Sequence, residues 1–181
     1  LLFIFWYSFE HEMIDFDTVN FLTGSNGSGK SVIMDALQII LLGETKSTIL
    51  NKAANKDSHR DLKSYLYGEL GDDGDLSFRY IRNKQTFTSY IAAEFYDTER
   101  KKSFTDIFVA DCYQDNSEPT KKWIILNEPI PDDHFIDPNT KSSYSFVQLK
   151  GYLKNTFGQN TYQVYDTNNA YQQAILGKYG Q

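Results

Sequence analysis

Apolar and polar positions divide the start of the chain into strand-like and helix-like stretches. Residues 1–7 are almost wholly apolar, which indicates a buried strand. A second strand is predicted at 18–23, with the polar stretch 8–17 as the connection between them. Residues 32–42 place apolar side chains at helical spacing and are followed by Gly43, so a helix is expected to end there.

From residue 64 onward the pattern changes to strands. Apolar alternation and turn signals predict strands at 65–70, 77–82, 86–96, 104–113 and 122–126. Because the connections are short and have no helical period, an antiparallel meander is expected. Helices are predicted at 146–157 and 170–179. The expected fold class is α/β with a mixed sheet, divided into a first lobe (1–64), the meander (65–128) and a helical or irregular part (129–181).

The stretch before the first helix reads Gly24-Ser25-Asn26-Gly27-Ser28-Gly29-Lys30-Ser31, which fits the phosphate-loop (P-loop) pattern G-x-x-x-x-G-K-[ST]. Glycine has no Cβ atom to block phosphate oxygens, and it tolerates the positive φ that a tight loop needs. Backbone N–H groups of the loop and of the helix N-terminus would face the phosphates. We expect Lys30 to reach the β- and γ-phosphates, as the catalytic residue, and the Ser31 hydroxyl to bind Mg²⁺. The predicted ATP-binding residues are Gly24, Ser25, Asn26, Gly27, Ser28, Gly29, Lys30, Ser31 and Val32.

Composition and charge limit the classes of protein that this chain can represent. The 181 residues have a formal net charge of −6, so overall charge does not attract the chain to nucleic acid. The single cysteine, Cys112, excludes an intrachain disulfide and lies in an apolar run typical of a buried position. No apolar run approaches the ~20 residues that span a bilayer, and residues 1–7 lack the flanks of a signal peptide. A cytoplasmic protein without a membrane partner is expected, and the missing initiator Met suggests a piece of a longer polypeptide.

Two further groups of side chains have both a functional and a simpler interpretation. Lys52, Lys56, Arg60 and Lys63 would share one face of a helix, either for phosphate contact or as a solvated face. Aromatic residues on the predicted strands could stack on bases, although packing within the sheet is favoured; they are Tyr80, Phe87 and Tyr90.

One histidine lies among carboxylates in the proline-rich stretch that follows the predicted meander. His134 is close in sequence to Asp132, Asp133 and Asp137, a combination that can bind metal. Proline-stiffened, irregular sequence does not present such ligands on a regular element, so the pattern disfavours a metal site.

The motif itself indicates a kind of P-loop protein. Residues 26–31, N-G-S-G-K-S, resemble the form found in ABC-type heads of SMC, RecF and RecN proteins. Residues 35–43, 51–55, 60–66, 87–90 and 94–97 resemble the heads of SMC-like ATPases, closest to the JetC type of the Wadjet plasmid-defence condensin and its MukB and MksB relatives. The resemblance implies the N-terminal lobe of a P-loop NTPase head. It also implies a homodimer that sandwiches ATP between heads and translocates or condenses DNA with kleisin and accessory subunits, in plasmid defence or chromosome organisation.

Other parts of such an ATPase are not found in the sequence. There is no apolar run of four residues followed by Asp-Glu, and no L-S-G-G-type signature. Asp111, after the apolar residues 107–110, is the nearest candidate for a magnesium-binding acid, but it lacks an adjacent glutamate. The family's glutamine-loop residue is not placed by the sequence: Gln114 follows a predicted strand, but its spacing does not identify it. The resemblance implies that the missing parts come from the C-terminal head segment of the same protein, so the chain alone is expected to be inactive as an ATPase.

Two alternatives remain open at the level of sequence. A DNA-repair or nuclease-associated ATPase of the RecF or OLD (overcoming-lysogenisation) type would carry a nuclease domain downstream of this lobe. A non-catalytic nucleotide-binding interaction module would bind nucleotide without hydrolysing it under any pairing.

Overall fold

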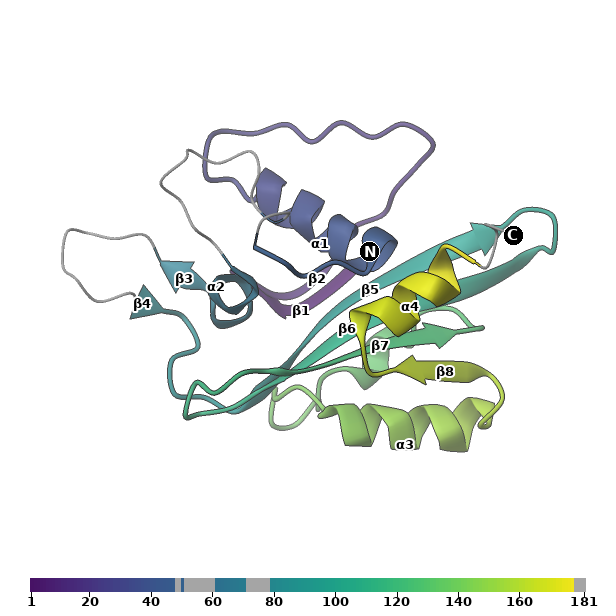
Figure 1. Cartoon of the computed structure of the whole chain (residues 1–181). Coiled ribbons are helices and arrows are strands. Elements are labelled where there is room, and N and C mark those ends of the chain that lie inside the picture. The colour runs from purple at the N-terminus through teal and green to yellow at the C-terminus, as the bar shows by residue number, and fades with distance from the viewer. Residues whose placement is uncertain (48–49, 51–60, 71–78, 178–181) are drawn as a thin grey trace.

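The computed structural model describes residues 1–47, 50, 61–70 and 79–177. Its centre is a six-stranded sheet with strand order β2-β1-β5-β6-β7-β8 (Figure 1). The strands are β1 (Leu2–Trp6), β2 (Phe9–Met13), β5 (Phe87–Asp97), β6 (Lys102–Cys112), β7 (Thr120–Leu126) and β8 (Tyr162–Tyr165). A separate short pair joins β3 (Glu69–Leu70) to β4 (Arg79–Tyr80).

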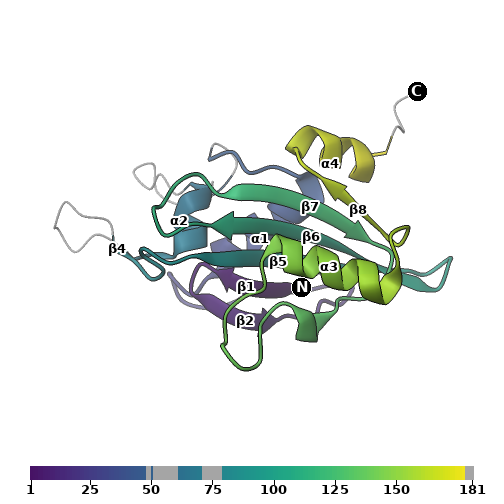
Figure 2. The ribbon, with the colours of Figure 1, turned by 90° about the horizontal axis from the view of Figure 1, so that it is seen from below.

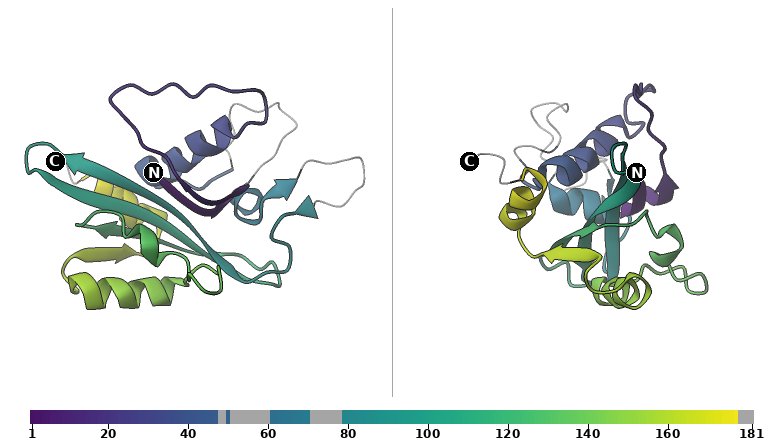
Figure 3. Two further views of the ribbon diagram at one scale, coloured as in Figure 1. Left: turned by 180° about the vertical axis from the view of Figure 1, so that it is seen from behind. Right: turned by 90° about the vertical axis from the view of Figure 1, so that its right-hand side faces the viewer.

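Helices cover both faces of the sheet. One face carries α1 (Lys30–Leu42), α2 (Leu62–Tyr67) and α4 (Asn168–Ile175), whose buried side chains share one core with the sheet. The opposite face carries α3 (Phe146–Phe157), which lies under the sheet in Figure 1 and nearest the viewer in Figure 2. The right-hand view of Figure 3 separates these layers, and a short 3₁₀ helix, η1 (Asp132–His134), precedes α3.

Strand alternation divides the apolar residues between two cores. In β5, Ile91 faces α1 while its neighbour Tyr90 belongs to the core on the α3 side. In β1 the alternation is interrupted at Phe5, whose φ is 49°. Phe3 and Trp6 therefore share the α1 side although they are three positions apart. This places the Trp6 side chain under the P-loop helix.

The predicted mixed sheet is wrong for the described residues, because every neighbouring pair in the central sheet is antiparallel. The strand predicted at 18–23 is also wrong. The second strand is β2, inside the predicted connection, because a tight turn at Tyr7 and Ser8 pairs it directly with β1. Residues 18–23 have no regular structure and are exposed, with Phe21 85% exposed.

The strand predicted at 65–70 is mostly helix. Asp61 caps α2 by accepting a hydrogen bond from the Ser64 backbone N–H at 2.8 Å, and α2 continues to Tyr67. Of the strand predicted at 77–82, residues 79–82 are described: Arg79–Tyr80 form β4, whereas 81–82 belong to a turn.

The remaining predicted elements are confirmed, with small shifts at their ends. The strands predicted at 86–96, 104–113 and 122–126 correspond to β5, β6 and β7, and the helix at 146–157 is α3. The helix predicted at 170–179 begins earlier, at Asn168, because Thr167 caps it through the Ala170 N–H. Strand β8 was not predicted. It lies in a short polar connection and pairs only with β7 at the sheet edge.

Candidate functional site

The P-loop lies at the end of a long irregular connection between β2 and α1, which arches over the helix in Figure 1. Gly24, Gly27 and Gly29 have φ angles of 148°, 83° and 90°, values that side-chain-bearing residues rarely adopt. A Cβ atom on Gly24 would lie 2.7 Å from Ser28 Oγ. The Ser28 N–H donates to the Ser25 carbonyl at 3.3 Å, which closes a turn inside the loop. The glycines are therefore required by the loop's own conformation.

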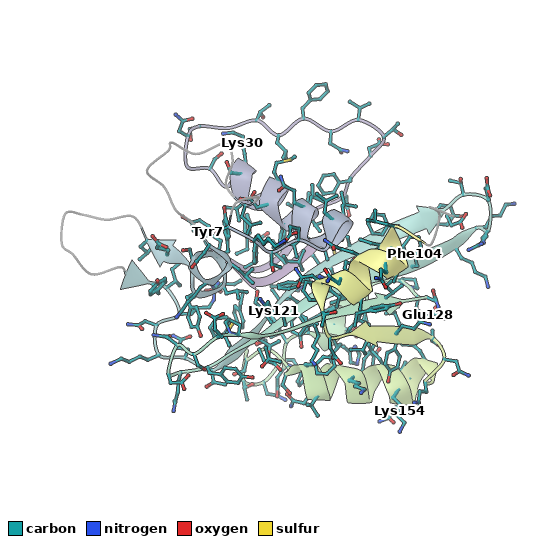
Figure 4. All side chains as sticks on the ribbon, in the orientation of Figure 1. Tyr7, Lys30, Phe104, Lys121, Glu128 and Lys154 are labelled. Carbon is teal, nitrogen blue, oxygen red and sulfur yellow. The ribbon has the colours of Figure 1, made fainter. Side chains whose placement is uncertain are left out.

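Lys30 folds back across this loop. Its Nζ donates to the carbonyls of Gly24 and Ser25, both at 2.7 Å, and to Ser28 Oγ at 3.3 Å. Figure 4 labels Lys30 at the loop end of α1. The ammonium group therefore occupies the concave side of the loop and is held by hydrogen bonds rather than by an acidic partner.

The N-terminus of α1 has the features of an anion-binding helix end. Gly29 is the N-cap residue, and neither a side-chain cap nor a first-turn acidic residue is found there in the described part of the chain. The first intrahelical bond runs from the Ile33 N–H to the Gly29 carbonyl at 3.1 Å. The backbone N–H groups of Lys30, Ser31 and Val32 are thus the end donors of the helix, and the dipole places partial positive charge on them.

Aromatic residues fix the position of this helix end. The Trp6 indole N–H donates to the Val32 carbonyl at 3.2 Å, and the Trp6 ring stacks on Tyr65 with centroids 5.0 Å apart. The Tyr65 hydroxyl in turn donates to the buried carboxylate of Asp35, one turn further along α1. Strand β1 and helix α2 therefore hold the start of α1 from below.

The hairpin of β1 and β2 supports the loop itself. Phe9 of β2 stacks on Phe3 of β1 with ring centroids 5.1 Å apart. A Cβ atom added to Gly29 would meet the Phe9 ring edge at 3.5 Å, so this ring lies directly against the last glycine of the loop.

The other end of α1 is held by α4. The Tyr171 hydroxyl donates to the Ile40 carbonyl and the Gln172 side-chain amide donates to the Leu42 carbonyl, each at 2.8 Å. Gly43 ends α1 in the left-handed region with φ 60°, and a Cβ atom there would lie 2.8 Å from the Tyr171 ring. Close contact between the two helices thus depends on the absence of a side chain at Gly43.

Asp111 does not lie beside the P-loop. Its carboxylate accepts hydrogen bonds from Thr88 Oγ1 at 2.6 Å and from the Phe146 backbone N–H at 3.2 Å. Strand alternation puts it on the α3 side of β6 with Ile107 and Val109, whereas α1 covers the other side. The structure therefore agrees with the sequence in disfavouring Asp111 as a magnesium-binding acid, and the residue anchors α3.

The other nucleotide-related candidates receive limited information from the structure. Gln114 is exposed in the turn after β6. Of the predicted basic face, Lys52, Lys56 and Arg60 lie outside the described residues. Lys63 is on α2 and donates to the Asn116 carbonyl at 2.7 Å.

The aromatic residues proposed for base stacking are packing residues. Tyr90 is fully buried on the α3 side and meets the Phe135 ring edge-on at 4.9 Å. Phe87 is buried on the opposite face, where Tyr67 lies between it and the ring of Tyr80. The interpretation of these side chains as internal packing is confirmed.

His134 pairs with Asp133 through Nδ1 at 2.6 Å and stacks on Tyr152 with centroids 3.7 Å apart. Asp132 instead pairs with His11, and Asp137 accepts backbone N–H bonds within its own turn. Across the described ranges, no group of three or more His, Cys, Asp or Glu side chains is arranged to hold a metal ion.

Cys112 is free and 1% exposed, as predicted. Burial raises the pKa of its thiol to about 12, which makes it unreactive near neutral pH. No described helix is long and apolar enough to cross a membrane.

Sequence analysis did not identify the side chains that hold α1 in place. The available signal was Asp35, an acidic residue on the buried stripe of an otherwise apolar helix that includes Val32, Ala36 and Ile39. A carboxylate in that position needs a buried donor, and Tyr65 supplies one. Its partner could not be identified, because 65–70 was assigned to a strand.

Comparison with protein families finds a match in the amino-terminal part of the chain. Residues 1–57 match the family described as a P-loop containing region of an AAA domain. The match covers β1, β2, the loop and α1, but not α2 or α4, which also hold α1 in place. No curated protein matches this chain.

Proposed function

We propose that this chain binds ATP with Mg²⁺ at the P-loop of residues 24–31. The observation that carries the proposal is the loop itself: three positive-φ glycines precede an uncapped helix N-terminus, with Lys30 folded over the loop. Such a helix end presents backbone donors and positive partial charge to phosphate oxygens. The family match to residues 1–57 supports nucleotide binding at the same place.

In this proposal each residue of the site has a distinct role. The β- and γ-phosphates replace the carbonyls of Gly24 and Ser25 as partners of the Lys30 ammonium. The Ser31 hydroxyl binds Mg²⁺, which keeps several of its waters. Backbone N–H groups from Ser25 to Val32 surround the phosphates, and Ser28 and Asn26 line the loop.

We further propose that the chain is the N-terminal head lobe of an SMC-like ATPase, in a DNA-translocating or condensing complex of the Wadjet or MukB kind. Exposed apolar side chains between β2 and the P-loop support the proposal that another segment packs there: Val19 is 69% exposed and Phe21 is 85% exposed. Exposed apolar side chains that cluster on one segment can mark an interaction site. The C-terminal head segment would cover them and supply the magnesium-binding acid, the water-activating glutamate and the signature sequence. Two completed heads would then sandwich ATP, with kleisin, accessory subunits and DNA bound in the full complex.

Calorimetric titration with ATP and Mg²⁺ tests the nucleotide site. Lys30→Ala should weaken binding at least tenfold, because a charge-assisted hydrogen bond contributes about 1.5–3 kcal/mol and 1.4 kcal/mol is tenfold. Ser31→Ala should chiefly reduce the dependence on Mg²⁺. Lys154→Ala is the matched control, since Lys154 is an exposed lysine of α3 on the opposite side of the sheet (Figure 4).

The larger assembly has its own measurement. The chain alone should show no ATP hydrolysis, and addition of the C-terminal head segment should restore turnover that Lys30→Ala abolishes. Robust hydrolysis by the isolated chain would contradict the proposed division of the head. ATP affinity that is equal in the Lys30→Ala and Lys154→Ala variants would contradict the nucleotide site itself.

A further inference from the structure

A second cavity lies at the opposite end of α1 from the P-loop. It has a volume of about 730 Å³, is open to solvent on one side, and is lined by the β5–β6 hairpin, the end of β7 and the last turns of α1 and α4. This size is within the range of small-molecule sites. Figure 4 labels Phe104, which lines the cavity from β6 and lies beside α4. Neither the P-loop nor the residues that anchor its helix end contribute to this cavity.

A buried carboxylate in this cavity has an unused hydrogen-bonding atom. Asp106 of β6 is 6% exposed, and its Oδ1 has no hydrogen-bond partner among the described residues. The neighbouring Tyr171 hydroxyl interacts with the Asp106 carboxyl, but it donates its 2.8 Å hydrogen bond to the Ile40 carbonyl. A buried acceptor without a donor is costly, so a group that donates to Oδ1 would be strongly favoured there.

The other residues that line the cavity indicate what the rest of a bound ligand would be like. Phe104, Ile125 and Ile175 provide apolar walls close to the carboxylate. Toward solvent, Arg100 pairs loosely with Asp97 at 3.7 Å, and Lys102 leaves the rim with one excess positive charge. The cavity thus has one buried hydrogen-bond acceptor, apolar walls and a polar entrance.

We propose that this cavity is a binding site for a small molecule that carries a primary ammonium group on an apolar body. The ammonium group donates to Asp106 Oδ1, and the body packs against Phe104, Ile125 and Ile175. Because Ile40 and Leu41 of α1 also line the cavity, the ligand contacts the P-loop helix at the end distant from its phosphate-binding loop.

Titration of the ¹⁵N-labelled chain with phenethylamine, followed by NMR, tests the proposal against 2-phenylethanol, a neutral probe of nearly the same shape. At pH 8, phenethylamine should shift the amide signals of Phe104, Ile125 and Ala174 and bind at least tenfold more tightly than the alcohol. Asp106→Asn should remove that difference while leaving the alcohol's affinity within about threefold. Asp133→Asn, which changes an exposed carboxylate of η1, is the matched control and should alter neither affinity.

A second arm uses pH. Burial raises the pKa of Asp106 to about 6, so at pH 5 the carboxyl is mostly protonated and phenethylamine should lose affinity while the alcohol does not. Tyr171 and Tyr165 face Asp106 from α4 and β8, and burial raises the pKa of both, so they stay neutral between pH 5 and 8. The rim groups are Asp97, Arg100 and Lys102.

Some results would overturn the proposal. They are equal affinity for amine and alcohol, unchanged amine affinity in Asp106→Asn, or signal shifts confined to residues outside the cavity. Absence of any shift at millimolar phenethylamine would also overturn it, and would indicate a cavity filled by protein.

Discussion

The Trp6 indole donates a hydrogen bond to the Val32 carbonyl at 3.2 Å and thereby joins strand β1 to the first turn of the P-loop helix. Val32 is the third residue of α1, so the bond is made close to the loop that we propose to bind phosphate. The start of helix α1 is therefore held by the core. The loop before it is exposed along most of its length.

Replacement of Trp6 by Phe tests this anchor. The change removes the indole hydrogen bond to the Val32 carbonyl, which still has its partner within the helix, so we expect a loss of about 0.5–1.5 kcal/mol in the free energy of unfolding, in addition to weaker stacking on Tyr65. Urea unfolding should report this loss of free energy. Trp123→Phe is a useful comparison, because the buried Trp123 indole nitrogen has no hydrogen-bond partner among the described residues. If Trp6→Phe and Trp123→Phe cost the same, the Val32 bond contributes nothing.

Arg82 should be among the most sensitive positions for stability. Its guanidinium donates to the carbonyls of Tyr7 at 2.7 Å, Leu66 at 3.2 Å and Phe9 at 3.1 Å, and the residue is 5% exposed. Arg82→Met keeps the apolar length but leaves these carbonyls without the donor. We expect a loss of about 1–3 kcal/mol in the free energy of unfolding for each buried carbonyl that is left unsatisfied.

Two measurements complete the Arg82 prediction. Arg82→Lys should recover only part of the stability, since an ammonium cannot reproduce the planar set of donors. An exposed control, Arg100→Met, should change stability by less than about 0.5 kcal/mol. A small effect at both arginines would show that the carbonyls of Tyr7, Leu66 and Phe9 are satisfied by water.

Asp106 makes stability depend on pH. Its pKa rises from 3.8 to about 6 on folding, a difference of about 2 units, or about 3 kcal/mol at 1.36 kcal/mol per unit. Because the folded pKa is the higher one, this contribution to stability is fully present below pH 3.8 and is lost as pH rises through about 6. Asp106→Asn should therefore stabilise the protein at pH 8 by up to about 3 kcal/mol, and the gain should vanish near pH 4.

Thermal unfolding of Asp106→Asn and of the unchanged chain across this pH range measures the effect. Glu118→Gln, at an exposed position with no ion pair among the described residues, should leave the pH profile unchanged. A gain for Asp106→Asn that is the same at pH 4 and pH 8 would contradict the role of its charge.

Two glycines should respond oppositely to alanine. Gly43 has φ 60° and its Cβ would lie 2.8 Å from the Tyr171 ring, so Gly43→Ala should destabilise the chain by about 1–3 kcal/mol. Gly151 lies inside α3, where a Cβ would meet nothing within 4 Å, so Gly151→Ala should stabilise by about 0.5–1 kcal/mol. Chemical denaturation of both variants measures the pair. Stabilisation by Gly43→Ala would show that α4 does not pack against the end of α1.

Sequence reasoning identified the elements whose signal is local. The loop of residues 24–31 has a spacing dictated by its own backbone, and α3 has a full capping box between Ser145 and Gln148. Strands β5, β6 and β7 were predicted because side chains of different polarity alternate along the sequence and turn signals separate the strands.

The predictions that were wrong depended on tertiary contacts, which the local sequence does not reveal. Residues 18–23 have the composition of a strand, but no strand among the described residues pairs with them. The apolar residues after Asp61 form helix α2 instead of a strand, because Asp61 caps the helix N-terminus. Asp106 and Asp111 are five positions apart on β6, so strand alternation places them on opposite sides of the sheet. Asp106 lines a cavity, whereas Asp111 anchors α3. Sequence spacing alone did not distinguish these roles.

The contact between Tyr171 and Ile40 joins residues that are separated by 131 positions. During synthesis, the carboxyl end of α1 must therefore wait for nearly the whole described chain to emerge before it gains its final hydrogen bond. Closing so long a segment is entropically expensive and slow. The helix that starts at the P-loop is therefore expected to become fully ordered late, after the meander beneath it has folded.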